Sequence, residues 1–472
     1  MTTRFGRRQM LSGAIASAVV AFDPSTGRWL RRAEAQPASV PVPPLDGELV
    51  LEGDALDEAA DDFGHIVHEL PWAVLRPGSV EDVQRMVRFC NRHRVGIAMR
   101  GQGHSTHGQP QVEGGVVIDS RSLASIDEVG PGGARVGPGV RWLDLLVFAL
   151  EQGLTPPVLT DYIELSIGGT LSVGGIGGHT QHHGMLVDNV LELEVITGRG
   201  ERVTCSPKQS RVLFESVLGG LGQFGIIVGA KVALLPAPTN ARVFRLFYSD
   251  LRTFTRDQRR ALAHGRFDYL EGQVLMQPEG GFEHELIAAL LAGLEPDVGA
   301  PVIEEHTYFD WSNRLAPLVE QLRASGAWDL PHPWIDLFLP DHVTDAFVQR
   351  VLDDLRPEDT GGGPMLCYPF RRSRLTRPFV AVPNTSTVFL FDLLRFAPPD
   401  PAVVEALVAQ NRELYERARN RGGKVYPVGS VPLSFVDWVA HFGVRFPAFA
   451  ARKLLFDPNG VLTPGQRIFP SL

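Results

Sequence analysis

The feature that most constrains this chain is a glycine-rich stretch, Arg100–Gln109, which follows a predicted buried strand, Val95–Met99. Its three glycines permit positive φ angles and let the backbone come close to a ligand. Successive backbone N–H groups in such a turn form a concave site suited to a diphosphate. The stretch therefore predicts a cofactor loop around the imidazole of His104. A tight turn with a surface histidine is the alternative.

Two further glycine-dense stretches lie downstream, at Gly168–Gly178 and Gly219–Val228. So many glycines allow the backbone to press against a flat or charged group. The first of them also carries apolar residues, such as Leu171 and Ile176, which are not typical of a flexible linker. Both stretches strengthen the prediction of a bound cofactor.

Length and charge limit the classes of protein to consider. A chain of 472 residues predicts two or three domains. The net charge of −9 argues against nucleic acid as a partner, because phosphate binding requires a basic surface. No apolar run has the length of a bilayer span, so stable membrane insertion is not expected.

The N-terminus resembles a twin-arginine export signal of bacterial type. Arg7 and Arg8 precede a short apolar run, Leu11–Phe22, and this order is typical of a leader rather than a membrane anchor. Ala33–Ala35 offers a cleavage site, at an unusual distance from the apolar run. We expect residues 1–35 to be a leader and the protein to be exported to the periplasm or the medium. A basic tail is the alternative.

The cysteines and a histidine cluster predict neither a disulfide framework nor a metal site. The cysteines are too widely spaced for either, so we expect small buried side chains. The histidines lack a companion carboxylate or cysteine at a recognisable spacing, so we expect them to bind no metal. The residues concerned are Cys90, Cys205, Cys367, His179, His182 and His183.

The pattern of helices and strands changes after Pro236–Pro238, where we predict a domain boundary. Before it, Trp142–Leu150 predicts a helix with one apolar face, made of Leu143, Leu146, Val147 and Leu150. After it, predicted helices alternate with predicted strands, which is typical of an α+β domain with an antiparallel sheet. The helices are Leu251–His264 and Phe282–Leu294, and the strands are Leu270–Met276 and Thr387–Arg395.

Five blocks in a fixed order resemble the cytokinin dehydrogenases, within the broader vanillyl-alcohol-oxidase-type (PCMH-type) family of FAD-binding oxidoreductases. The block Phe267–Gly272 and the C-terminal block favour the cytokinin branch. The five blocks are Arg100–Gln109, Thr160–Gly178, Leu191–Val228, His332–Pro340 and Phe456–Phe469.

The resemblance implies an α+β protein with a two-subdomain FAD-binding domain and an α+β cap domain that binds the substrate. The expected divisions are a linker at 36–57, the FAD-binding domain at 58–239, the cap at 240–425, and a segment at 426–472 that returns to the FAD-binding domain.

The resemblance also implies specific site residues. FAD would be attached covalently through a single link to His104, because relatives with two links have a cysteine in the second glycine stretch and this chain has none between 160 and 180. Asp161 would accept a proton from the substrate amine, with Glu271 as the next candidate; a turn or helix-cap role is the alternative for Asp161. The cofactor would contact Met99, Gly101, Gln102, Gly103, His104, Ser105, Gln109, Asp161, Ser166, Ser172, Ile176, Ile227, Tyr426, Thr463 and Gln466.

The implied reaction is oxidation of the C–N bond of an N6-isoprenoid adenine by hydride transfer to the flavin. The imine product would hydrolyse to adenine and an aldehyde, and a quinone-like acceptor or oxygen would take the electrons. Two departures leave the substrate open: Tyr426–Pro432 replaces a Leu-Pro-His-Tyr segment of plant members, and Asp336 replaces their usual Asn. The alternatives are a secreted oxidase of a sugar, alcohol or secondary metabolite on the same fold, and a non-enzymatic flavin-binding protein with a degenerate site.

Overall fold

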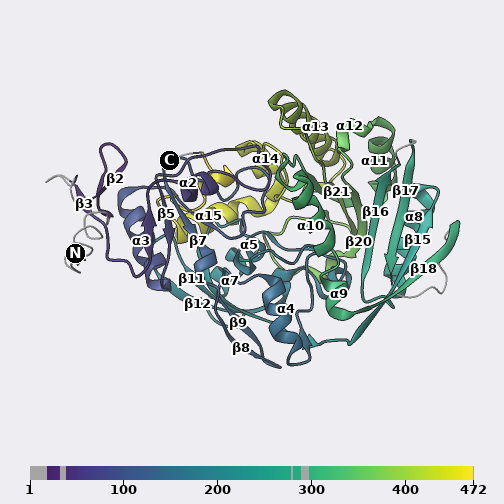
Figure 1. The fold of residues 1–472 in the computed structure, drawn as a ribbon, viewed down its shortest axis with the longest axis horizontal. Coiled ribbons are helices and arrows are strands. Elements are labelled where there is room, and N and C mark those ends of the chain that lie inside the picture. The colour runs from purple at the N-terminus through teal and green to yellow at the C-terminus, as the bar shows by residue number, and fades with distance from the viewer. Residues whose placement is uncertain (1–18, 32–33, 35–38, 278–279, 289–296, 471–472) are drawn as a thin grey trace, which may run out of the picture.

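The computed structural model describes residues 19–31, 34, 39–277, 280–288 and 297–470. These residues form two large parts that lie side by side, with the earlier residues at the left of Figure 1 and most later ones at the right. Mixed helices and mainly antiparallel sheets confirm the predicted α+β class.

The first part begins with a four-stranded sheet in the order β4–β5–β7–β6. Strands β5, β7 and β6 are parallel, and β4 is antiparallel to β5. Helix α3 buries Val83, Met86 and Val87, and Ser79 caps it by accepting a hydrogen bond from the N–H of Asp82. The bounds are β4 Glu48–Val50, α2 Asp54–Ala59, β5 Ala73–Arg76, α3 Val80–His93, β6 Ile97–Arg100, β7 Val116–Asp119 and η1 Ser120–Ser122.

A second sheet of five antiparallel strands follows, in the order β12–β11–β13–β9–β8. Of the two later glycine stretches, Gly168–Gly178 begins within α5 and Gly219–Val228 ends within β13. The strands are β8 Ile126–Gly130, β9 Gly133–Val136, β11 Val190–Ile196, β12 Arg202–Cys205 and β13 Ile226–Val232, with a separate pair β10 Leu154–Thr155 and β14 Leu235–Pro236. The helices are α4 Trp142–Leu150, α5 Ile167–Val173, α6 Thr180–His183, η2 Leu186–Asn189 and α7 Arg211–Val217.

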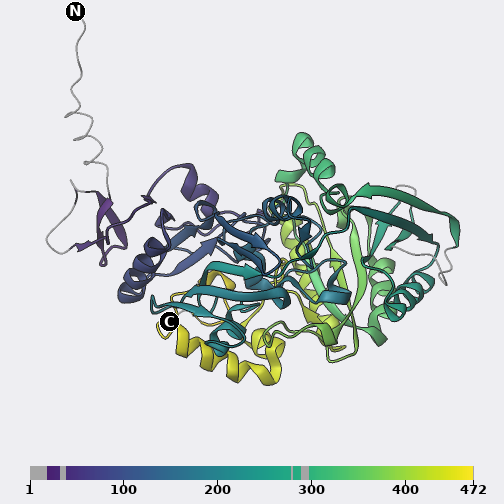
Figure 2. The same ribbon diagram turned by 90° about the horizontal axis from the view of Figure 1, so that it is seen from below.

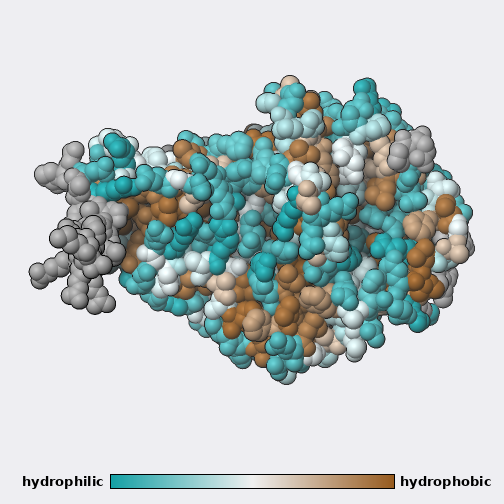
Figure 3. Space-filling model, viewed as in Figure 1, coloured by the Kyte–Doolittle hydropathy of each residue, from teal (hydrophilic) through white to brown (hydrophobic). Residues whose placement is uncertain are grey.

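Helix α4 has the predicted bounds but a different buried face. Its core residues include Trp142 and Leu145, whereas Val147 is 41% exposed. The prediction was wrong here because α4 is apolar nearly all round, so the pattern could not select the side that packs. The outward side contributes to the apolar patch at the lower edge of Figure 3.

The second part is built on an eight-stranded antiparallel sheet, in the order β18–β15–β17–β16–β20–β21–β19–β22. Helices α8, α11 and α13 pack with it in one apolar core on one face. The strands are β15 Asn240–Tyr248, β16 Leu270–Met276, β17 Phe282–Ala288, β18 Val298–Thr307, β19 Ile335–Pro340, β20 Met365–Arg371, β21 Thr387–Leu393 and β22 Lys424–Val425. The helices are α8 Leu251–His264, α9 Tyr308–Ser312, α10 Ala316–Ser325, η3 Ala327–Asp329, α11 Asp341–Asp354, α12 Pro357–Thr360, η4 Arg372–Arg374 and α13 Pro401–Arg419.

One predicted helix in this part is a strand. The residues expected to begin helix Phe282–Leu294 form β17, which pairs with β15 on one side and β16 on the other. Pairing on both sides satisfies the backbone polar groups of a buried segment, and this tertiary effect overrides local helix propensity. Residues 289–296 lie outside the described part of the chain.

The chain returns to the first part after β22. The backbone N–H of Ile97 donates to the carbonyl of Val461, and that of Thr463 donates to the carbonyl of Ile97. Figure 2 shows the C-terminal helices in yellow along the first part. Their bounds are α14 Phe435–Phe442, η5 Gly443–Arg445, α15 Phe446–Phe456 and η6 Pro464–Gln466.

The N-terminal region contains more structure than a leader and a linker. Strands β1 (Val19–Asp23) and β2 (Arg28–Arg31) form a hairpin, and β3 (Val40–Pro41) pairs with β1. The buried ring of Trp29 lies 5.3 Å from that of Phe89 on α3. The predicted linker 36–57 also contains β4 and the start of α2, because its apolar residues pack on the first sheet. Arg7 and Arg8 lie outside the described residues.

Candidate active site

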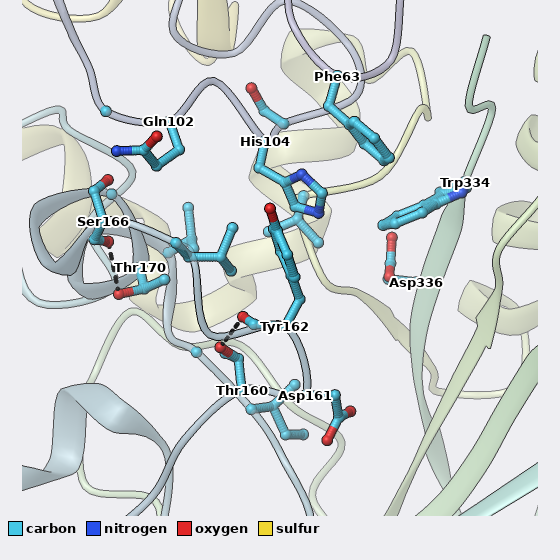
Figure 4. Close-up of a pocket in the computed structure, with 18 of the residues that line it drawn as sticks. Phe63, Gln102, His104, Thr160, Asp161, Tyr162, Ser166, Thr170, Trp334 and Asp336 are labelled. Atoms are coloured by element: carbon cyan, nitrogen blue, oxygen red, sulfur yellow. Dashed lines mark hydrogen bonds between the residues drawn. The ribbon is translucent and has the colours of Figure 1, made fainter. Parts of the chain in front are cut away.

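One cavity lies between the glycine-rich loops of the first part and one face of the eight-stranded sheet. Its volume is about 610 Å³. Every residue with a predicted catalytic or cofactor role lines it, and several are labelled in Figure 4. These residues are Met99, Gly101, Gln102, Gly103, His104, Ser105, Gln109, Asp161, Ser166, Ser172, Ile176, Ile227, Glu271, Tyr426, Thr463 and Gln466.

The glycines of the first loop stand where any side chain would collide with neighbouring residues. A Cβ atom on Gly101 would lie 1.9 Å from Ser166 Oγ. One on Gly103, whose φ is 68°, would lie 2.3 Å from the guanidinium of Arg100. Ser166 is the N-cap residue of α5, so the first two glycine stretches meet here. Both glycines line the cavity, so the wall here is backbone without side chains, as close approach to a diphosphate requires.

His104 faces the cavity among aromatic rings. Its imidazole stacks on Phe63 at 4.1 Å between ring centroids and lies 4.9 Å from Tyr162. Burial lowers the pKa of His104 to about 3, so the ring is neutral near pH 7. A neutral imidazole has a nitrogen lone pair that can form a covalent bond to an electrophilic carbon.

The carboxyl group of Asp62 fixes the loop that carries His104. Its oxygens accept hydrogen bonds from the N–H of Gly108 at 2.7 Å, the N–H of Gly64 at 3.0 Å and the hydroxyl of Ser105 at 3.2 Å. Burial raises the pKa of Asp62 to about 7. No sequence motif points to a role for Asp62.

The segment 426–430 closes the cavity from the C-terminal side. The hydroxyl of Thr106 donates to the carbonyl of Val428 at 3.0 Å. The N–H of Gly175 donates to the hydroxyl of Tyr426 at 2.8 Å. Contacts with both the first and second glycine stretches therefore hold this segment in position.

Asp161 belongs to a cluster that joins the two parts of the protein. Nη2 of Arg314 donates to Asp161 Oδ1 and to Glu271 Oε2, both at 2.8 Å. The hydroxyl of Tyr269 donates to Asp161 Oδ1 at 2.7 Å and also hydrogen-bonds to Glu271. One arginine thus pairs with two carboxyl groups, one from a glycine-rich segment and one from β16.

The two carboxyl groups of this cluster do not have the same surroundings. Burial and the nearby charge of Asp161 raise the pKa of Glu271 to about 7, and Arg314 opposes this rise. Asp161 lies at the cavity wall with 18% of its side chain exposed, against 8% for Glu271. Asp161 is the carboxylate of the pair that is more open to a ligand.

A second pair of acidic residues, Asp336 and Asp392, lines the sheet side of the cavity. The cavity also contains Arg245, which is already paired with Glu285 at 2.7 Å and Glu304 at 3.0 Å. The cavity lining therefore contains more acidic side chains than cationic side chains that lack an acidic partner.

The histidine cluster lies behind the cavity. The ring of His179 packs against Tyr269 at 5.0 Å, and Nε2 of His182 hydrogen-bonds to the carbonyl of Phe267 at 2.5 Å. Within the described ranges, no three His, Cys, Asp or Glu side chains are grouped so that they could hold a metal. Cys90, Cys205 and Cys367 are free and buried, as predicted. No helix in the part of the chain that the structure describes has the length and apolarity needed to cross a membrane.

Sequence reasoning missed several cavity residues. Arg314 follows α9 in a segment with no motif, and Asp392 lies in an apolar strand. The one sequence signal for this wall of the cavity was the alternation of polar residues along β16. It predicts that Glu271 and Gln273 lie on the same face of the sheet. The aromatic residues Phe63, Tyr162, Trp328 and Trp334 also line the cavity.

The chain matches two family models. The model described as "Cytokinin dehydrogenase 1, FAD and cytokinin binding" matches residues 238–288 and 282–469. The model described as "FAD binding domain" matches residues 71–206. The FAD-binding match falls within the first part, and the other match covers the second part together with the C-terminal segment that returns to the first.

Relatives are similar over nearly the whole chain. An uncharacterized oxidoreductase of the fasciation locus of Rhodococcoides fascians is 38% identical over 426 residues, which cover 88% of this chain and 97% of the relative. Cytokinin dehydrogenase 4 of Oryza sativa subsp. japonica is 35% identical, over 90% of this chain and 91% of its own. Cytokinin dehydrogenase 2 of Arabidopsis thaliana is 35% identical, over 90% and 94%.

Proposed function

The chain belongs to the cytokinin dehydrogenase-like family of FAD-binding oxidoreductases, and we propose that it oxidises the C–N bond of an N6-isoprenoid adenine. The observation that carries this proposal is the cluster of Asp161, Tyr269, Glu271 and Arg314, which presents a carboxylate to the cavity. A carboxylate beside a substrate N–H can act as a general base.

The residues of the cavity fit FAD. The loop around Gly101 and Gly103 has no room for side chains and presents backbone to a diphosphate. We propose that a single covalent bond joins FAD to His104, because this neutral imidazole faces the cavity and no cysteine lies between 160 and 180. When bound, FAD supplies the two-electron acceptor that takes a hydride from the carbon next to the substrate nitrogen.

Asp161 accepts the proton of the substrate N–H in this proposal. Losing that proton makes hydride loss from the neighbouring carbon easier, because the nitrogen lone pair then stabilises the developing positive charge. Arg314 orients the carboxylate through its 2.8 Å contact. Glu271, with its pKa near 7, can offer a hydrogen bond to the substrate heterocycle as a donor or an acceptor. The resulting imine hydrolyses to adenine and an aldehyde.

The balance of charge in the cavity supports an amine substrate over an anionic one. Asp161, Glu271, Asp336 and Asp392 line it, and Arg314 compensates only the first two. An anion such as a sugar acid would meet net repulsion, whereas N–H donors would meet acceptors.

Anaerobic reduction tests the substrate. Holoprotein is mixed with a panel of N6-isoprenoid adenines, sugars and simple alcohols, and flavin bleaching is followed. We expect the adenines to bleach the flavin. Bleaching by a sugar or an alcohol alone would contradict the proposal and favour a different oxidase on the same fold, and no bleaching by any compound would favour a flavin-binding protein.

The covalent link has its own test. Denatured wild-type protein on a gel should show flavin fluorescence, and His104→Ala protein should not. Release of all the FAD from the wild type in acid would contradict the link.

Export and the electron acceptor complete the proposal. Arg7 and Arg8 support export by a twin-arginine route, and replacing both with Lys should retain the protein in the cytoplasm. The acceptor we propose is a quinone-like molecule or oxygen. Comparing oxygen uptake with quinone reduction during turnover distinguishes the two.

A further inference from the structure

Two buried carboxyl groups face each other on the sheet side of the cavity. Asp336 on β19 lies directly opposite Asp392 on β21 in the antiparallel register. Each residue is 5% exposed, and their side chains hydrogen-bond to each other. Both line the cavity that contains His104 and Asp161, and Figure 4 shows Asp336 beside Trp334.

The surroundings of this pair favour the retention of a proton. Burial raises the pKa of Asp336 to about 7, and burial together with the charge of Asp336 raises the pKa of Asp392 well above its ordinary value. Two carboxyl groups in contact cannot both ionise easily, so one shared proton is the favoured state. Among the described residues, no Lys, Arg or His forms an ion pair with either one.

Two oxygens of the pair have no partner within the described protein. They are Asp336 Oδ2 and Asp392 Oδ1, which are buried and accept no hydrogen bond. An unpartnered buried carboxyl oxygen is costly. A Cβ atom on Gly429 would lie 2.5 Å from Asp336 Oδ2, so only a glycine lets the backbone of 426–430 pack this close to the oxygen. Because both side chains line the cavity, a ligand in the cavity can supply the missing partner.

The register of the sheet gives the position of the pair relative to the base. Gln273, Leu366, Asp392 and Asp336 lie in one row across β16, β20, β21 and β19. Glu271 is two residues from Gln273, on the same face. With strands about 4.8 Å apart, Asp392 lies about 10 Å from the strand of Glu271. The intervening lining is mainly apolar, and Leu366 and Leu390 belong to it.

We propose that the Asp336–Asp392 pair binds a hydrogen-bond donor at the end of the substrate that lies farthest from Glu271. This inference rests on the proposed function, because Asp161 and Glu271 take the amine and the heterocycle and leave the isoprenoid tail to extend along the sheet. The pair therefore selects a tail that ends in a hydroxyl or amino group over a purely hydrocarbon tail.

Binding to holoprotein tests the inference without turnover. The probes are two adenines, one with an N6-isopentenyl tail and one whose tail ends in a hydroxyl group. The protein carries Asp161→Asn, and the dissociation constants come from the change in flavin absorbance. We expect the hydroxylated probe to bind about tenfold or more tightly, the effect of a hydrogen bond to a charged group.

Variants of the pair identify the source of this preference. Adding Asp336→Leu or Asp392→Leu should bring the ratio of the two dissociation constants close to one, whereas Asp392→Asn should keep most of the preference. Asp353→Leu, which removes an exposed carboxylate of α11, is the matched control and should keep the ratio. Asp336→Ala replaces the Leu variants if melting curves show that they do not fold.

Equal affinities in the Asp161→Asn protein, or a preference that survives the changes to both aspartates, would overturn the inference. Failure to bind either probe would overturn it as well. The proposed function is judged separately, since it fails if neither probe reduces the flavin of the wild type, whatever the binding ratio.

Discussion

The two pairs of acidic residues in the cavity have similar charge and different surroundings. Asp161 and Glu271 share the guanidinium of Arg314, which contacts both at 2.8 Å. Asp336 and Asp392 hydrogen-bond to each other, and within the described chain neither has a cation as an ion-pair partner. Both pairs line the same cavity.

The difference determines what each pair can do. A carboxylate with an arginine beside it can remain ionised while buried, which a general base requires. A pair without a cation retains a proton and acts as a hydrogen-bonding group instead. Under the proposed function, the contrast separates chemistry at one end of the cavity from substrate recognition at the other.

The two pairs also depend on different parts of the fold. Asp161 precedes α5 in the first part, whereas Glu271 and Arg314 come from the second part, so the first pair exists only when the parts are packed together. Asp336 and Asp392 are direct neighbours in one sheet, and strand register alone brings them together.

The most damaging change to the first pair is Asp161→Asn, which keeps the shape and removes the charge. A general base is typically worth about a hundred- to ten-thousandfold in rate, roughly 3–5 kcal/mol at about 1.4 kcal/mol per decade. We expect the rate of flavin reduction by an isoprenoid adenine to fall by at least about two decades, with the visible spectrum little changed because His104 is untouched. Rapid mixing under anaerobic conditions measures this rate.

A fall of less than about tenfold would make Asp161 a structural residue and Glu271 the next candidate base. Glu271→Gln is the matched control. If Asp161 is the base, this change should lower the rate much less than Asp161→Asn does.

Removing the positive charge of Arg314 should make the Asp161–Glu271 pair resemble the Asp336–Asp392 pair. In Arg314→Gln protein, Asp161 and Glu271 lose their shared positive charge and together bind a proton more tightly. The pH–rate profile should move to higher pH, and on its acid limb each unit of displacement lowers the rate at a given pH by about tenfold. Arg314→Lys, which keeps the charge, should displace the profile less. An unchanged profile would contradict this role of Arg314.

Local signals were enough to predict the glycine-rich wall of the cavity. The glycines at 101 and 103 mark close contacts that only a missing side chain allows. A local run rich in glycine reveals such positions in the sequence. Helix α8 and strand β16 have their predicted bounds, since the spacing of apolar residues along the chain is a local property.

The sheet wall could not be predicted in the same way. β17 is a strand because it pairs on both sides, and the contact of Arg314 with Glu271 spans 43 positions of sequence. Asp336 and Asp392 become neighbours only through the pairing of β19 with β21. Each of these contacts joins residues that are far apart in the sequence, so the local periodicity of apolar and polar residues does not reveal them.

The smallest expected effect concerns the second pair and the stability of the fold. The pKa values of Asp336 and Asp392 are raised in the folded protein, mainly by burial. A carboxyl group whose pKa is raised by folding contributes stability that is fully present when the pH is below its ordinary pKa. This contribution is lost as the pH rises toward the pKa in the folded protein, which is about 7 for Asp336. The melting temperature of the wild type should therefore fall between about pH 4 and about pH 7 through this pair.

Replacing both residues, as Asp336→Asn with Asp392→Asn, removes both titrations and should reduce that fall by on the order of a few degrees. A residual slope should remain, because burial also raises the pKa values of Asp62 and Glu271 to about 7. Melting curves of both proteins across this pH range measure the difference, and Asp353→Leu is the control that should follow the wild type. Identical slopes in the double variant and the wild type would mean that the pair does not titrate on unfolding. In that case, Asp336 and Asp392 would have a nearby positive charge in the folded state, as Asp161 and Glu271 have in Arg314. The two pairs would then no longer differ in their electrostatic surroundings.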